Sequence, residues 1–170
     1  GKVNGEPAPE ELDGIRSGTR LKARWNSFDG TKVFAGLLDS TRNEMCSVRR
    51  FTDTKSYCVP SKSGPVVYRD NACTMPIGRQ PRTTCPVTTV DYFVETDPMT
   101  CDGSAVKVYA RGAQISLPTY YIKSATACAG FTPTSSDLFL LGAEVPITEL
   151  AMFEEPALVK TRPQKNTRKA

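Results

Sequence analysis

The 170-residue sequence contains no histidine, and this absence narrows the chemistry open to it. Ser-His-Asp and Cys-His nucleophilic catalysis both need an imidazole base. Histidine is also the commonest protein ligand of metal ions, so histidine-bound catalytic metals are excluded as well. The nucleophile motif G-x-S-x-G is missing too. We therefore expect a protein that is not an enzyme and that uses no cofactor.

Hydrolysis by a pair of carboxylates needs no histidine, so the acidic residues require separate attention. Glu144 stands in the apolar context GAEVP, and Asp91 and Glu95 flank Tyr92 and Phe93. A carboxylate on a surface or in a hairpin has the same sequence context. We interpret all three acids in that way and predict no hydrolase activity.

The sequence has no run of 18 apolar residues, which excludes a transmembrane helix. Its first residues lack the charged start and apolar stretch of a signal peptide, although secreted proteins lose that peptide on maturation. No C-x-x-C pair and no D-x-D-x-D-G run is present, so neither a zinc nor a calcium site is expected. The predicted set of metal ligands is therefore empty.

Six cysteines are present, and an even, widely spread set favours disulfide bonds in an oxidising compartment. We expect a secreted, periplasmic or cell-surface protein; the alternative is six buried free thiols in a cytosolic protein. The short separations within the first two pairs favour pairing in chain order. The predicted disulfides are Cys46–Cys58, Cys73–Cys85 and Cys101–Cys128.

The net charge of +4 is unevenly distributed along the chain. Residues 160–170 carry five basic residues and no acid, which leaves a charge of 4 − 5 = −1 for the rest. We interpret residues 1–16 as a linker, 17–157 as a single β domain and 158–170 as a basic tail. The tail has no aromatic residues that could stack on bases, so nucleic acid is an unlikely partner.

Regular cysteine spacing suggests an internal repeat. Cys46, Cys73, Cys101 and Cys128 are separated by 27, 28 and 27 residues. Short apolar and aromatic segments precede three of them, namely VVYRDNAC, DYFVETDPMTC and TYYIKSATAC. We interpret each as a strand followed by a polar turn and a cysteine, in hairpin repeats of about 27 residues.

The local pattern is that of β-strands. Leu21, Ala23 and Trp25 alternate with basic residues, and Asp29-Gly30 then provides a hairpin turn. Thirteen prolines and twelve glycines interrupt the chain too often for long helices. Residues 147–153 form the one helical candidate, and we prefer a single turn that leads into a final strand.

The seven short segments that together suggest a known family are SGTRLK at 17–22, DG at 29–30, FAG at 34–36, Cys46, CVP at 58–60, YRDNACT at 68–74 and LGAEVP at 141–146. In this order they resemble a family of secreted, presumed lipoprotein domains of unknown function from myxobacteria. The resemblance covers about residues 17–155. It implies export and a cell-surface or extracellular setting, but it carries no activity, substrate or site residues.

Hairpin repeats of this length cannot each bury their own apolar face, so they must pack around a shared core. All-β chains avoid exposed sheet edges by closing on themselves. We therefore predict an all-β fold that is a disulfide-stapled, closed ring of hairpins, either propeller-like or a distorted barrel. Closure would pair the first strand, 21–25, with the last, 150–154. A β-sandwich is the alternative.

A rigid β scaffold without catalytic residues favours a binding module that uses its loops and aromatic side chains. The expected ligand is a protein or a glycan at the cell surface. The alternative is a structural or assembly subunit that docks onto other copies of itself. The candidate contact residues are Trp25, Tyr68, Tyr92, Tyr109, Tyr120 and Tyr121.

Overall fold

The computed structural model describes residues 18–82 and 88–153, and this part of the chain is all-β. Five strands form one sheet in the order β1-β2-β3-β4-β12, and seven form a second in the order β10-β9-β5-β6-β11-β8-β7. The strands of the first sheet are β1 (Leu21–Phe28), β2 (Thr31–Asp39), β3 (Glu44–Arg50), β4 (Ser56–Pro60) and β12 (Ala151–Phe153). Those of the second are β5 (Ser63–Tyr68), β6 (Pro76–Pro81), β7 (Tyr92–Thr96), β8 (Ala105–Ile115), β9 (Tyr120–Lys123), β10 (Cys128–Phe131) and β11 (Ser136–Val145).

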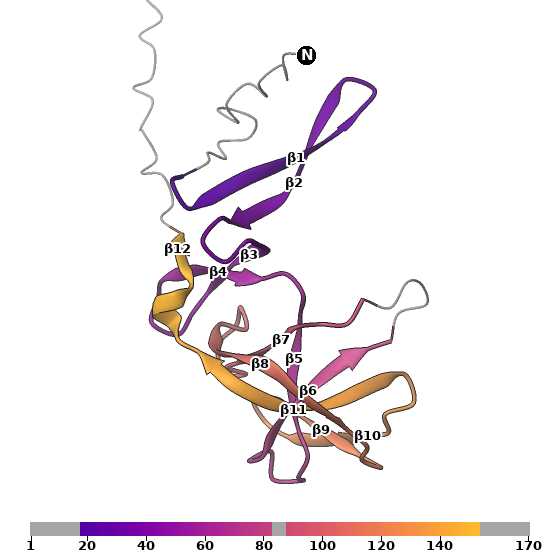
Figure 1. The fold of residues 1–170 in the computed structure, drawn as a ribbon. Coiled ribbons are helices and arrows are strands. Elements are labelled where there is room, and N and C mark those ends of the chain that lie inside the picture. Colours follow the sequence, from indigo (N-terminus) through magenta and orange to yellow (C-terminus); the bar gives the residue numbers. More distant parts are fainter. Residues whose placement is uncertain (1–17, 83–87, 154–170) are drawn as a thin grey trace, which may run out of the picture.

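The second sheet closes into a five-stranded barrel through an additional pairing of β5 with β7. This pairing is parallel and aligns Ser63 with Tyr92 and Gly64 with Phe93. The other neighbours around the barrel are antiparallel. The expectation of an all-β fold with a closed, distorted barrel is confirmed, and the first sheet forms a half-barrel beside it (Figure 1).

The predicted pairing of the first strand with the last strand is wrong. The last strand, β12, lies in the same sheet as β1, but it pairs with β4 and aligns Ala151 with Cys58. Leu21 and Ala151 still pack in one hydrophobic cluster, so the two ends of the half-barrel approach each other. The ring closes instead between two strands from the middle of the chain. The expected turn before the last strand is confirmed as a 3₁₀ turn, η1 (Ile147–Glu149).

Glycines make room for a large side chain inside the barrel. Phe93 is fully buried and packs at a tilt against Phe139, with 5.8 Å between ring centroids. A Cβ atom added to Gly78 would lie 2.3 Å from the Phe93 ring. One added to Gly64 would lie 2.5 Å from the carbonyl oxygen of Arg79. Only glycine fits at these two positions, because a methyl group would overlap atoms already in place.

A shared hydrophobic cluster joins the half-barrel to the closed barrel. Phe51, Tyr57 and Val59, from in and around β3 and β4, pack with Val94 of β7 and Val108 of β8. Leu150, directly before β12, completes the buried contacts. The two sheets therefore share this cluster, while each also has a smaller cluster of its own. The predicted linker 1–16 and tail 158–170 lie outside the described residues.

Two disulfides are present among the described residues, and one of them corrects the predicted pairing. Cys46–Cys58 joins β3 to β4 as expected. Cys73, however, is bonded to Cys128, so the predicted Cys73–Cys85 and Cys101–Cys128 bonds are wrong. Cys101 is free and exposed, and Cys85 lies outside the described residues.

The disulfide between Cys73 and Cys128 also contradicts the repeat. The evenly spaced cysteines occupy unlike positions: Cys46 lies within β3, Cys73 and Cys101 lie in turns, and Cys128 begins β10. Cys73 adopts a positive φ of 52°, which is uncommon for a residue with a side chain. The even spacing therefore does not mark equivalent structural units.

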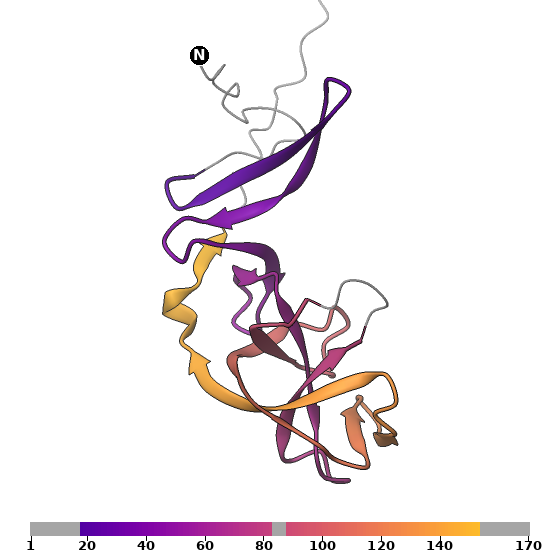
Figure 2. The same cartoon turned by 45° about the vertical axis from the view of Figure 1, so that its right-hand side comes forward.

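The β1–β2 hairpin projects from the rest of the described chain, as both views show (Figures 1 and 2). Its turn follows the sequence expectation: Asp29 and Gly30 both have positive φ, as a tight two-residue hairpin turn requires. Trp25 aligns with Phe34 and Phe28 with Thr31. The far end of the hairpin therefore extends beyond the half-barrel core.

Candidate functional site

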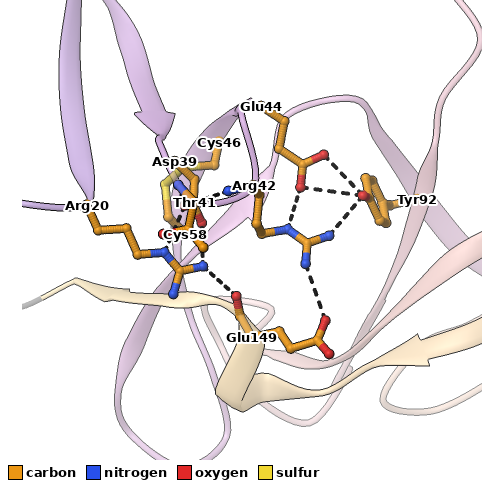
Figure 3. A network of polar contacts seen from close by, with 9 residues as sticks. All are labelled: Arg20, Asp39, Thr41, Arg42, Glu44, Cys46, Cys58, Tyr92 and Glu149. Atoms are coloured by element: carbon orange, nitrogen blue, oxygen red, sulfur yellow. Dashed lines mark hydrogen bonds and ion pairs between the residues drawn. A yellow bond between two sulfur atoms is a disulfide. The ribbon is translucent and has the colours of Figure 1, made fainter.

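A pocket of about 570 Å³ lies where the half-barrel meets the closed barrel. The turn between β2 and β3 forms one wall, η1 a second, and the start of β7 a third (Figure 3). Charged and hydroxyl groups dominate the lining. The lining residues are Arg20, Thr41, Arg42, Glu44, Tyr92, Thr148 and Glu149.

Arg20 and Asp39 form the first part of a polar network beside this pocket. The guanidinium donates two hydrogen bonds of 2.8 Å, one to each carboxylate oxygen, and a third of 2.6 Å to the carbonyl of Glu149. Asp39 also accepts from the backbone N–H groups of Thr41 and Arg42. Burial raises the pKa of Asp39, but these bonds and the charge of Arg20 outweigh burial and lower it overall.

Arg42 is the centre of the second part. Its guanidinium bonds the Glu44 carboxylate, the Tyr92 hydroxyl at 2.9 Å and the Glu149 carboxylate at 3.4 Å. Burial lowers the pKa of this guanidinium, but the bonds to Glu44 and Tyr92 raise it overall. One side chain thus joins the β2–β3 turn to both η1 and β7.

Tyr92 receives one hydrogen bond and gives another. Its hydroxyl accepts from Arg42 and donates to Glu44 at 3.1 Å. Burial is the largest of the effects that raise its pKa. The shifts of Asp39, Arg42 and Tyr92 therefore all favour the form found at neutral pH. Such groups can hold charges and hydrogen bonds in place, but they are poorly suited to moving protons at neutral pH.

A second, smaller cavity of about 140 Å³ lies beside β5 and brings Tyr68 near Glu95. Glu95 accepts a hydrogen bond of 3.3 Å from the hydroxyl of Tyr109. Burial and then the charge of Glu95 raise the pKa of Tyr109 to about 12. Two of the six predicted aromatic residues thus surround one predicted carboxylate.

The other predicted residues are scattered. Tyr120 is buried and stacks on Phe131, and Tyr121 is half-buried on the same strand. Glu144 is exposed and lies 3.5 Å from Lys107, and Asp91 is also exposed. The six aromatic side chains therefore do not form one binding face.

Trp25 belongs to the projecting hairpin. It makes an edge contact with Phe34, with 5.3 Å between ring centroids, and it packs against the half-barrel cluster. Its indole N–H is buried and finds no acceptor among the described residues. Trp25 is the only tryptophan of the chain, so its fluorescence reports on this hairpin alone.

Sequence reasoning missed the exposed apolar residues around Trp25. Phe28 is 65% exposed, Val33 50% and Phe34 37%. A signal was available, because Phe28 and Val33 flank the Asp29-Gly30 turn, where side chains have few neighbours to cover them. It also missed Arg20, Arg42 and Glu149, which look like ordinary surface charges in the sequence.

No group of three or more potential metal ligands occurs within residues 18–82 and 88–153. This part of the chain also has no helix that is long and apolar enough to cross a bilayer.

Comparison with known proteins returns one finding. Neither the curated proteins nor the solved structures contain a significant match. A family model, described as a family of unknown function (DUF7481), matches residues 9–161. The matched family is one of unknown function, in agreement with the sequence resemblance, whereas secretion, lipid attachment and a myxobacterial origin stay predictions. Because the match covers most of its length, the chain belongs to the DUF7481 family of unknown function.

Proposed function

We propose that the protein is a non-enzymatic binding module of the cell surface or extracellular space, and that it engages a protein partner through the β1–β2 hairpin. The observation that carries this proposal is the exposed apolar surface of that hairpin. Phe28, Val33 and Phe34 gather around one projecting turn, next to the partly exposed Trp25.

Single exposed apolar residues are ordinary on protein surfaces and need no explanation. Several neighbouring ones on a projecting element are different, because they leave apolar area in water that a partner would cover. Aromatic side chains are also the residues that contribute most to binding energy at protein interfaces. A protein ligand therefore fits this hairpin better than a glycan.

The polar pocket supports the non-enzymatic part of the proposal. The ionisable side chains in and beside it bond one another, and the shifted pKa values of Asp39 and Arg42 favour their charged forms. In this proposal the network holds the half-barrel and the closed barrel together. The proposed location outside the cytosol is supported by the two disulfides, which persist in oxidising compartments.

The alternative role, an assembly subunit, would use the same hairpin against another copy of the chain. The two roles differ in oligomeric state. A binding module stays monomeric until its partner is added, whereas an assembly subunit associates by itself. Sedimentation of the purified chain over a range of concentrations distinguishes them.

The test is selection of peptides from a random displayed library on the folded protein. Phe28→Ser combined with Val33→Ser removes the exposed apolar groups at the tip. The matched control combines Met75→Ser with Met99→Ser, which removes two similarly exposed side chains from turns of the closed barrel. Circular dichroism establishes that both variants fold.

We expect enriched peptides that bind the parent and the methionine variant but lose binding to the hairpin variant by about tenfold or more. A library that yields no binders contradicts the proposal, as do peptides that bind all three proteins equally. A glycan array that gives binding unaffected by the hairpin variant would replace the protein ligand with a glycan.

A further inference from the structure

The free edge of the first sheet narrows the kind of partner that the hairpin takes; this inference rests on the proposed function above. β1 stands at the end of the strand order and is hydrogen-bonded along one side to β2. From Trp25 to Phe28, no strand within the described residues pairs with its other side. An end strand of this kind offers backbone N–H and C=O groups to an incoming strand.

The two faces of the hairpin both carry apolar side chains beside this edge. Successive residues of a strand point to opposite faces, and directly paired residues share a face. Trp25 and Phe34 are therefore on one face, while Phe28 is on the other. Val33 shares the face of Phe28, because it aligns with Asn26.

This two-sided arrangement fits an added strand. The side chains of such a strand alternate between the faces, so some would cover Trp25 and Phe34 and the others Phe28 and Val33. A ligand that lies flat on one face would reach only half of the exposed apolar groups. Stacked bases of a nucleic acid need aromatic rings along one continuous track, which the opposite faces do not provide.

The excess of basic residues on the hairpin indicates that the partner segment is negatively charged. Between residues 21 and 34 the bases are Lys22, Arg24 and Lys32, and the only acid is Asp29. Arg24 and Lys32 form no ion pair with the described residues. Arg24 lies on the face of Phe28, and Lys32, which aligns with Ser27, lies on the face of Trp25. Each face thus combines an apolar pair with a base.

We propose that the partner contributes an extended segment in which two apolar residues alternate with two acidic ones, so that each face of the added strand carries both kinds, and that this segment adds to the sheet beside Trp25–Phe28. Its backbone would bond the free side of β1, and its acids would approach Arg24 and Lys32. A second copy of this chain fits less well, because pairing β1 with another β1 would bring equal basic charges together.

The probe is a synthetic octapeptide in which two valines alternate with two glutamates (VVEEVVEE), acetylated and amidated at its ends. Two matched peptides serve as controls: one replaces every glutamate with lysine, and one carries N-methyl groups on alternate amides, which block hydrogen bonds along one edge. Binding is followed by the fluorescence of Trp25. Amide hydrogen exchange, measured by NMR, shows which backbone groups of β1 become protected.

We expect the glutamate peptide to bind and to slow exchange of amides between Arg24 and Phe28. The lysine peptide should bind at least about tenfold more weakly, because like charges meet across the new edge. The N-methylated peptide should lose binding. Combining Arg24→Glu with Lys32→Glu should reverse the preference between the glutamate and lysine peptides.

Several results would overturn the inference: no binding of the glutamate peptide, equal binding of both charged peptides, or binding without amide protection in β1. An oligothymidylate that shifts Trp25 emission with similar affinity would point to nucleic acid, and a concentration-dependent dimer broken by Phe28→Ser combined with Val33→Ser would point to a second copy. Library peptides that need Phe28 and Val33 but lack acids would defeat this inference and leave the proposed function standing. Loss of the hairpin dependence itself would defeat the proposed function.

Discussion

The guanidinium of Arg20 holds the carboxylate of Asp39 through two hydrogen bonds of equal length, 2.8 Å each. Asp39 is only 1% exposed, so its charge depends on this partner and on the backbone N–H groups of the β2–β3 turn. The pair fixes the start of the polar network that ties the half-barrel to η1.

The lowered pKa of Asp39 predicts a specific dependence of stability on pH. A carboxyl with a lower pKa in the folded state stabilises the protein above its usual pKa of about 3.9, and this contribution is lost as the pH falls through the folded-state pKa. Asp39→Asn should therefore cost about 2 kcal/mol of unfolding free energy at pH 7. Urea unfolding at several pH values should show this difference shrinking below pH 4. A difference that does not change with pH would contradict the prediction.

Gly78→Ala tests the packing inside the barrel. Because the added methyl group would overlap the ring of Phe93, we expect a loss of about 2–3 kcal/mol in unfolding free energy. Gly18→Ala is the control, since the nearest atom to its new Cβ lies 3.8 Å away. Adding Phe93→Leu to Gly78→Ala should restore part of the loss, so the two changes should not be additive. Full additivity would show that the Phe93 ring is not the obstacle.

Tyr109 should be the last of the described tyrosines with resolved shifts to ionise, because its pKa is raised to about 12. A raised phenol pKa contributes stability below the unfolded value of about 10, and that contribution is lost as the pH rises through about 12. Ultraviolet titration of phenolate should lose its highest step in Tyr109→Phe. Glu95→Gln should move that step to lower pH, because the neighbouring negative charge is removed. An unchanged step in both variants would contradict the assignment.

The sequence predicts structure formed by residues that are close in the chain better than contacts between distant segments. The strand at 21–25, the Asp29-Gly30 turn and the turn before the last strand are local patterns, and all three occur in the structure. The Cys46–Cys58 disulfide can also be predicted from the sequence, because its cysteines are only 12 residues apart. The parallel pairing of β5 with β7 leaves no local pattern, because the sequence of a strand does not specify which distant strand lies beside it.

The same reasoning explains the partial success at the candidate sites. The sequence predicts Tyr92 as a contact residue because its aromatic ring can pack against a ligand, and Tyr92 does line the pocket. Arg20 and Glu149 are 129 residues apart, and only the folded sheet brings them together. The even cysteine spacing is misleading, because equal intervals of 27 or 28 residues do not determine which thiols meet in space.

The bond between Cys73 and Cys128 predicts a large effect on stability. It closes a loop of 55 residues and should contribute about 4 kcal/mol, against about 3 kcal/mol for the 12-residue loop of Cys46–Cys58. Replacing each pair with serines and comparing urea unfolding tests this order. Non-reducing peptide mapping should recover Cys73 linked to Cys128. A peptide that links Cys73 to Cys85 would contradict the structure.

Arg42 gives the last prediction, because it joins three elements through a single side chain. Arg42→Met keeps most of the aliphatic stem but removes the hydrogen bonds, which leaves the hydroxyl of Tyr92 and the Glu44 carboxylate without their cation. We expect a loss of about 2 kcal/mol in unfolding free energy. Arg24→Met removes an exposed arginine that forms no ion pair with the described residues, so it should change the unfolding free energy by less than about 0.5 kcal/mol. A double-mutant cycle with Tyr92→Phe measures the coupling free energy between Arg42 and Tyr92, which we expect to be stabilising. This coupling should weaken only slightly in 0.5 M salt, because both side chains are partly buried. Equal effects of the two arginine variants would show that Arg42 does not hold the half-barrel and the closed barrel together.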